Sequence, residues 1–285
     1  MSRFRLRGRR RRPREARADR VPLRAIVPNL VTSMAACAGI TSISFSSEGR
    51  FLSALWALLV ACICDGIDGR IARLLNASSK LGAELDSLAD FVNFGVAPAM
   101  FMYFWMTGGP GHTLADGTVV ARPFIRIVLG CALYYALCDC FRLARFNTML
   151  EQETAPYWTN FFTGVPAPGG CWMVLTPAMI ALALDLKWQP SPYMGIFMLL
   201  FVGTLMGSRL PTISLKHVHI SRRSMPFVLA GLLLLIAFLV SNFWLALGVI
   251  GLGYICTIPI SGWFFVRTRA RYERLQKTEA DEPTA

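Results

Sequence analysis

The sequence predicts an all-α membrane protein, a polytopic helical bundle with a six-helix core and two additional transmembrane helices at its C-terminal end. Its 285 residues are 54% hydrophobic and only 16% charged, with a mean hydropathy of +0.48. Apolar runs long enough to cross a bilayer, each about 20 residues, recur along the chain. A soluble core of this size would need a more highly charged covering surface.

The apolar runs define the expected helices. We predict eight spans, at approximately residues 27–47, 51–75, 81–105, 123–141, 165–186, 191–210, 226–241 and 243–266. Hydrophobic runs of this length, bounded by polar or turn-forming residues, are typical of membrane helices. The last two spans contain no acidic residue, basic residue or histidine, so we expect them to be structural.

The basic residues predict the orientation. With the N-terminus in the cytoplasm, 25 of the 29 lysines and arginines fall on the cytoplasmic side, and both termini are cytoplasmic. This topology suits a multi-pass protein of the cytoplasmic (inner) membrane. Eleven arginines lie in residues 1–24, an arm that we expect to rest on anionic lipid headgroups. Nucleic acid is not an expected partner, because most of the remaining chain is lipid-soluble.

Four aspartates inside predicted spans are the main functional signal: Asp65, Asp68, Asp86 and Asp90. A carboxylate within a membrane is costly and should face a polar interior. The spacings of three and four place each pair on one helix face, and a short connection between antiparallel helices brings the pairs to one depth. Four ionised carboxylates there would repel, so we predict two divalent cations, Mg²⁺ or Mn²⁺, which prefer oxygen ligands.

An alternative is that the aspartates pair with nearby cations, namely Arg70, Arg73 and Lys80. Those cations lie nearer the helix ends. Small residues follow the same faces, since Gly69 and Ala72 continue the face of Asp65 and Gly82 precedes Asp86 by four. Small residues allow close helix approach and also leave room for a phosphate group, which favours a ligand site.

The residues from Asp65 to Asp90 carry a family signature. They read D-G-I-D-G-R-I-A-R, eight further residues, then G-A-E-L-D-S-L-A-D. This segment resembles the CDP-alcohol phosphotransferase family, matching D-x-x-D-G-x-x-A-R-x8-G-x3-D-x3-D at every fixed position. The resemblance covers roughly residues 24–220. It implies that Asp65, Asp68 and Asp86 are metal ligands and that Asp90 is a ligand, the general base, or both; Asp86 and Asp90 are the expected catalytic residues.

The resemblance also implies a reaction and a domain organisation. CDP-diacylglycerol would donate its phosphatidyl group, and a homodimer is expected. The expected CDP-lipid-binding residues are Gly69, Ala72, Arg73 and Gly82, with Asn29 and Thr32 in the first span. We therefore divide the chain into a basic arm (1–24), a catalytic membrane domain (25–220), two additional helices (221–266) and a cytoplasmic tail (267–285).

The acceptor alcohol is predicted from flanking residues. The stretches 28–32, 87–98, 142–147 and 164–168 resemble bacterial membrane-embedded phosphatidylserine synthases, which implies L-serine as acceptor and CMP as the second product. Glycerol 3-phosphate, inositol phosphate and choline are the alternative acceptors.

Serine is a zwitterion, so its site needs a cation for the carboxylate. Arg142 and Arg145, three apart on one face, suit that role. They can equally be positive-inside anchors, and Asp139 is an alternative partner for Arg142. Asn93 follows the stripe of Asp86 and Asp90 about one turn deeper, where it can bond the acceptor or a neighbouring helix.

A cation transporter is the alternative from another class, since intramembrane aspartates also mark ion pathways. Transporter sites typically lie near the bilayer midplane, with broken helices and inverted repeats. Here the aspartates lie toward one face, beside Arg73 and a cluster of small residues. The pattern therefore favours the enzyme.

Overall fold

The computed structural model describes residues 26–77, 79–113, 117, 119–149, 161–184, 192–208, 211–213, 224–258 and 261. The predicted basic arm (1–24) and tail (267–285) lie outside the described residues, so the predictions made for them stand as predictions.

Helices dominate the described chain. They are α1 (Ile26–Ser47), α2 (Phe51–Leu74), α3 (Lys80–Asp90), a π-helical segment η3 (Phe91–Val96), α4 (Ala97–Thr107), a 3₁₀ turn (Gly109–Gly111), α5 (Arg122–Met149), α6 (Ala167–Ala183), α7 (Pro192–Gly207), α8 (Met225–Ser241) and the helix Phe243–Ile258. The strands β1 (Phe161–Thr163) and β2 (Pro211–Ile213) form one short antiparallel pair.

The predicted all-α membrane bundle is confirmed, with the β1–β2 pair as an addition. Each predicted span has a helical counterpart, and the third consists of α3, η3 and α4 in succession. Helix α5 runs on to Met149, eight residues beyond the predicted end at 141. Within the described residues, three helices are long and apolar enough to cross a membrane, namely Ile26–Ser47, Phe51–Leu74 and Arg122–Thr148.

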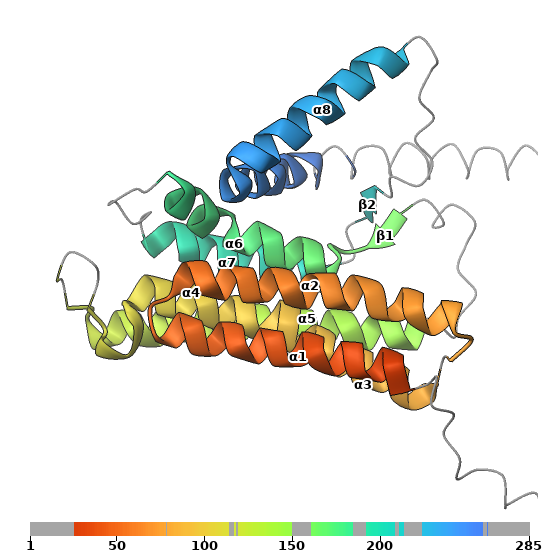
Figure 1. Ribbon diagram of the computed structural model, residues 1–285. Helices are drawn as coiled ribbons and strands as arrows, with labels where there is room; N and C mark the ends of the chain where they lie inside the picture. Colours follow the sequence, from red (N-terminus) through yellow and green to blue (C-terminus); the bar gives the residue numbers. More distant parts are fainter. Residues whose placement is uncertain are drawn as a thin grey trace, which may run out of the picture.

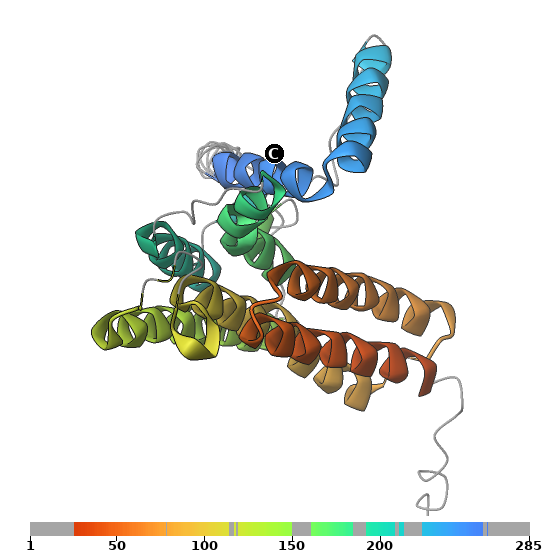
Figure 2. The same cartoon turned by 60° about the vertical axis from the view of Figure 1, so that its left-hand side comes forward.

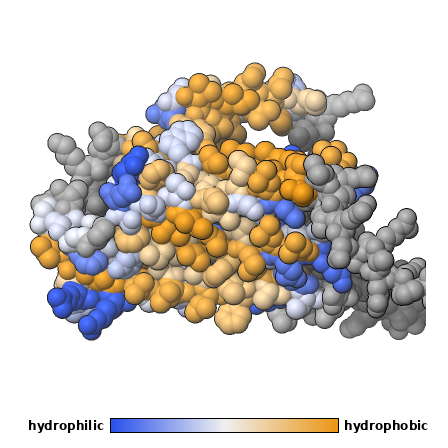
Figure 3. Space-filling model, turned by 60° about the horizontal axis from the view of Figure 1, so that its bottom comes forward, coloured by the Kyte–Doolittle hydropathy of each residue, from blue (hydrophilic) through white to orange (hydrophobic). Residues whose placement is uncertain are grey.

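The helices form a bundle with one projecting arm. The α3–η3–α4 segment packs between α1 and α2 on one side and α5 on the other. Helix α6 packs on η3 and α4, α7 packs on α5 and α6, and α8 leans away from the rest (Figure 1, Figure 2). Figure 3 shows apolar side chains over the middle of one face and hydrophilic side chains toward its two ends. That distribution is typical of a bundle whose middle contacts lipid and whose ends contact water.

Helices α1 and α2 form a tight hairpin. The face that α1 buries consists of small or short residues at helical spacing: Pro28, Thr32, Ala35, Gly39, Ser42 and Ser46. Small side chains let two membrane helices approach closely. The Ser42 hydroxyl also donates to the Ala54 carbonyl of α2 at 3.0 Å, and the turn uses Gly49 at φ +75°.

The π-helical segment η3 has an identifiable cause. Pro98 has no backbone N–H, so the Phe94 carbonyl cannot receive its usual α-helical bond from residue 98. The buried Tyr135 hydroxyl of α5 donates to that carbonyl at 3.0 Å, and the Ala97 N–H bonds Val92 in the wider i to i+5 pattern. Because a π turn holds more residues than an α turn, the side chains after Asp90 face different neighbours from those of a regular helix.

Candidate active site and metal centre

Three of the four predicted metal-binding aspartates come together. Asp65 of α2 and Asp86 and Asp90 of α3 each offer a carboxylate oxygen, and these oxygens all lie within 4.8 Å of one another. The connection between α2 and α3 is short and both helices pack against α1, so their acidic faces converge. The convergence expected from the spacing is therefore observed for these three side chains.

Asp68, the fourth aspartate, is held by other groups. Its side chain is buried, at 3% exposure; Oδ2 accepts a bond from the Thr32 hydroxyl at 2.6 Å and Oδ1 from the Gly69 N–H at 2.5 Å. Asp68 still shares a cavity wall with Asp86. The structure thus places Asp68 beside the three-carboxylate cluster, tied to α1 through Thr32.

The cluster suits a divalent cation. Two unit charges 4.8 Å apart repel by about 3 kcal/mol at an effective dielectric constant of about 20. Asp90 Oδ1 is buried and has no hydrogen-bond partner among the described residues. Carboxylate oxygens crowded together, one of them unpartnered, are the donor set that Mg²⁺ and Mn²⁺ prefer.

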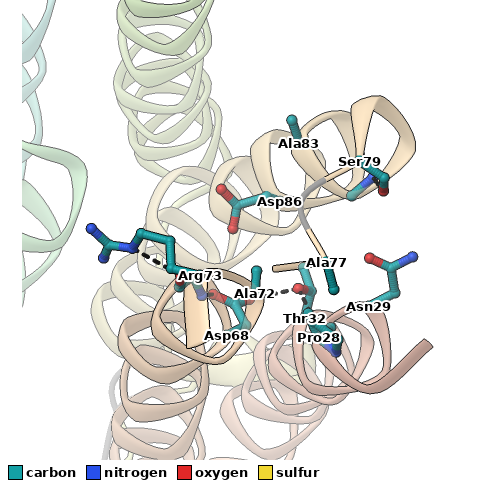
Figure 4. Close-up of a pocket in the computed structure, with 12 residues that line it drawn as sticks. Pro28, Asn29, Thr32, Asp68, Ala72, Arg73, Ala77, Ser79, Ala83 and Asp86 are labelled. Atoms are coloured by element: carbon teal, nitrogen blue, oxygen red, sulfur yellow. Dashed lines mark hydrogen bonds between the residues drawn. The ribbon is translucent and has the colours of Figure 1, made fainter. Parts of the chain in front are cut away.

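A cavity of about 260 Å³ opens beside the cluster, between the start of α1, the end of α2 and the start of α3 (Figure 4). Its lining includes every residue predicted to bind the CDP-lipid, together with two of the aspartates and four other residues: Pro28, Asn29, Thr32, Asp68, Gly69, Ala72, Arg73, Ala77, Ser79, Gly82, Ala83 and Asp86. The cavity therefore brings these predicted binding residues together, although their roles remain predictions.

Sequence reasoning missed part of this wall, namely Pro28, Ala77, Ser79 and Ala83. One signal was available: Ser79 is the N-cap of α3, and its hydroxyl accepts a bond from the Gly82 N–H at 3.0 Å. Serine immediately before a helix is a common start signal. A helix starting there has its first turn beside the end of α2.

The two glycines of the cavity do different things. A Cβ at Gly82 would lie 2.9 Å from Asn29 Oδ1 and 3.1 Å from Ser79 Oγ, so Gly82 permits close packing. A Cβ at Gly69 would meet no atom within 4 Å. Gly69 consequently leaves open space in the cavity wall.

The cations of this region are not paired with the aspartates. Among the described residues, the ion pairs are Arg50 with Glu48 and Arg142 with Asp139. Arg73 is exposed at the cavity wall, and its Nε donates to the Gly69 carbonyl at 3.1 Å (Figure 4). The pairing of the aspartates with Arg70, Arg73 or Lys80 is therefore not observed.

The arginines predicted to bind the acceptor have separate partners. The Arg142 Nε bonds Asp139 Oδ1 at 3.2 Å. The Arg145 guanidinium donates to the Gly207 carbonyl at 2.8 Å and to the Ser208 carbonyl at 3.1 Å, at the C-terminal end of α7. A guanidinium there satisfies carbonyls that the helix leaves unbonded, so Arg145 connects α5 to α7.

Asn93 lies in η3, three residues after Asp90, where the helix changes from α to π geometry. Its side chain is fully buried. It packs against Gly39 of α1, since a Cβ added there would lie 2.2 Å from Asn93 Oδ1. Neither amide atom of Asn93 has a hydrogen-bond partner among the described residues.

Comparison with known proteins identifies the family. The family model for CDP-alcohol phosphatidyltransferase matches residues 25–208. A CDP-diacylglycerol–serine O-phosphatidyltransferase of Mycobacterium leprae is 36% identical over 88% of this chain and 78% of its own length. One of Helicobacter pylori is 34% identical over 68% of this chain and 74% of its own length. A solved phosphatidylinositol phosphate synthase of Mycobacterium tuberculosis, in complex with manganese and citrate, aligns with a TM-score of 0.42 at 16% identity, covering 64% of this chain and 76% of that chain. The chain belongs to the CDP-alcohol phosphatidyltransferase family.

Proposed function

We propose that this protein transfers the phosphatidyl group of CDP-diacylglycerol to L-serine, giving phosphatidylserine and CMP. The observation that carries the proposal is the cluster of Asp65, Asp86 and Asp90 beside a cavity lined by the remaining signature residues. The relatives named for this reaction align over most of the chain.

Within this proposal, Asp65, Asp86 and Asp90, together with Asp68, hold two divalent cations, Mg²⁺ or Mn²⁺. Bound there, the cations supply electrostatic stabilisation of the charge that develops on the diphosphate. Arg73 binds a phosphate oxygen from the cavity wall, and Gly69, Ala72, Gly82, Asn29 and Thr32 accommodate the rest of the CDP group.

Asp90 accepts the proton of the serine hydroxyl in this mechanism. The serine oxygen then forms a bond to the phosphorus that carries diacylglycerol, and the bond from that phosphorus to the CMP oxygen breaks. The Asp90 carboxylate belongs to the cluster, which supports this role, because a base must lie within hydrogen-bond reach of the proton that it accepts. Asp86 orients the same centre from one turn earlier on α3.

The proposal extends to the membrane. The acyl chains of the donor stay in the bilayer while the CDP group enters from the cytoplasm, and both chain termini are cytoplasmic. Residues 25–220 form the catalytic domain, 221–266 add two transmembrane helices, and the basic arm 1–24 contacts anionic lipids. The enzyme works as a homodimer.

An acceptor assay tests the function. The purified full-length protein in lipid nanodiscs receives CDP-diacylglycerol, Mn²⁺ and one radiolabelled acceptor: L-serine, glycerol 3-phosphate, inositol phosphate or choline. We expect metal-dependent CMP release and labelled lipid with serine only. Labelled lipid from another acceptor instead would overturn serine as the substrate, and no CMP release with any acceptor would overturn the reaction class.

A further inference from the structure

One buried carboxylate takes no part in the proposed metal centre. Asp139 of α5 has no exposed surface, and only its Oδ1 is bonded, to Arg142. Its Oδ2 is buried and has no hydrogen-bond partner among the described residues. An intramembrane carboxylate with an unused oxygen is costly, and such groups commonly serve a functional site.

The partner of Asp139 also has unused hydrogen-bonding capacity. The Arg142 side chain is largely buried, at 14% exposure, and its Nε is the atom that bonds Asp139. No hydrogen bond of its two Nη groups appears among the described residues, whereas both Nη groups of Arg145 bond carbonyls of α7. Of these two arginines, Arg142 is the one with N–H groups left for a ligand.

The Asp139–Arg142 pair lies close to the level of the reacting groups. Helix α5 runs antiparallel to α3 and η3, since Asn147 bonds Ser87 and Asp139 Oδ2 lies 2.8 Å from where a Cβ of Gly95 would be. Arg142 falls between these two contacts along α5. Asp90 and Gly95 are five residues apart, or about 7 Å along a helix.

We propose that Asp139 and Arg142 together recognise the α-amino and α-carboxylate groups of the acceptor, with Asp139 Oδ2 accepting a bond from the ammonium and the Arg142 Nη groups donating to the carboxylate. The inference rests on the proposed function and assigns to Asp139 a role in acceptor selection. Arg142 then lies within about one helical turn of the level of Asp90. An α-amino acid with a β-hydroxyl carries its ammonium, carboxylate and hydroxyl groups within a few ångströms of one another, so it could contact the pair and Asp90 together.

Charge explains why this pair would select serine. The pair is neutral overall, with one charge of each sign, and the serine zwitterion offers the complementary arrangement. Glycerol 3-phosphate or inositol phosphate would place a negative phosphate near the unpartnered Asp139 oxygen, and choline has no carboxylate for Arg142. Selection would come from unpaired or like charges with the wrong acceptor as much as from attraction to serine.

Acceptor analogues test the two contacts separately. Wild type, Asp139→Asn and Arg142→Gln are compared with L-serine, with glycerate, which has a hydroxyl in place of the ammonium, and with ethanolamine, which lacks the carboxylate. Glu48→Gln, in the exposed Glu48–Arg50 ion pair, is the matched control.

For Asp139→Asn we expect the KM for serine to rise by about tenfold or more, the effect of losing one charged contact of about 1.4 kcal/mol, with the KM for CDP-diacylglycerol unchanged. The preference for serine over glycerate should fall. Arg142→Gln should lower the preference for serine over ethanolamine. The control should match wild type.

The result that overturns the proposal is a folded Asp139→Asn protein whose KM for serine and preference over glycerate equal those of wild type. If the Asn or Gln variant does not fold, Asp139→Glu and Arg142→Lys keep both charges and shift their positions; unchanged serine KM values there would also overturn it. Wild-type protein that makes no phosphatidylserine would instead count against the proposed function itself.

Discussion

Two regions of the molecule bury their surfaces in opposite ways. One is the cavity end, where the start of α1, the end of α2 and the start of α3 meet. The other is the C-terminal pair, which consists of α8 and the helix Phe243–Ile258. At the cavity, buried or cavity-lining groups are polar or very small, including Asp68, Thr32 and Gly69. Residues 225–258 contain no acidic residue, basic residue or histidine. Helix α8 buries none of its residues, and the helix Phe243–Ile258 contacts α6 through glycines.

The difference separates chemistry from packing. In a membrane, a buried polar group is costly unless it has a partner or a ligand. The cavity end keeps such groups, some without partners, whereas the C-terminal pair only has to match lipid and to pack against α6 and against Trp56 of α2. Changes at the cavity end should therefore affect turnover more than stability, and changes in the C-terminal pair should do the opposite.

The largest effect should come from Asp86→Asn. Removing one charge from the cluster should lower CMP release by about 10²-fold or more, the scale of losing a charge-stabilising group, and should weaken Mn²⁺ binding measured by electron paramagnetic resonance. Glu84→Gln, an exposed acid on the same helix, is the control and should retain both. Normal Mn²⁺ binding by Asp86→Asn would remove Asp86 from the metal centre.

A second test fills the cavity at Gly69. Gly69→Leu should project into open space, so the melting temperature in detergent should hold while the KM for CDP-diacylglycerol rises by about tenfold. Gly130→Leu is matched, since a Cβ at Gly130 on α5 also meets no atom within 4 Å. Equal KM values in both variants would show that the space beside Gly69 is not used by the donor.

The aspartate cluster and the cavity beside Gly69 could be predicted from the sequence because their geometry is local. Spacings of three and four residues, plus a short connection, suffice to bring Asp65, Asp86 and Asp90 together. The π-helical segment Phe91–Val96 was not predicted, and the bond from the Tyr135 hydroxyl to the Phe94 carbonyl within it joins residues 41 apart in the sequence. Spacing along one helix contains no information about such a bond.

Long-range partners also explain the remaining differences. Arg145 has the carbonyls of Gly207 and Ser208 as partners, more than 60 residues away. The pairing of β1 with β2 joins segments separated by almost 50 residues, and no short turn signals it. Residues that face their partners only after the bundle assembles cannot be assigned from local periodicity.

In the C-terminal pair, Gly251→Leu should reduce stability. A Cβ at Gly251 would lie 2.2 Å from Thr176 Oγ1 of α6, so a larger side chain must separate the two helices, at a cost of about 1–3 kcal/mol. Gly253→Leu, two residues along, meets no atom within 4 Å and should melt like wild type. Turnover per folded molecule should be normal in both; a selective loss of turnover in Gly251→Leu would contradict the division between the two regions.

The smallest effect should come from Tyr135→Phe, which removes a polar contact that serves structure within the catalytic bundle. The Phe94 carbonyl would lose the hydroxyl that replaces the N–H missing at Pro98, and the melting temperature should fall by the equivalent of about 1 kcal/mol. Tyr134→Phe is the matched control, because the Tyr134 hydroxyl forms an exposed bond to Thr204. If both variants melt at the same temperature, the buried Tyr135 bond does not hold the π-helical segment. It would then contribute no more to the stability of the bundle than the exposed Tyr134 bond does.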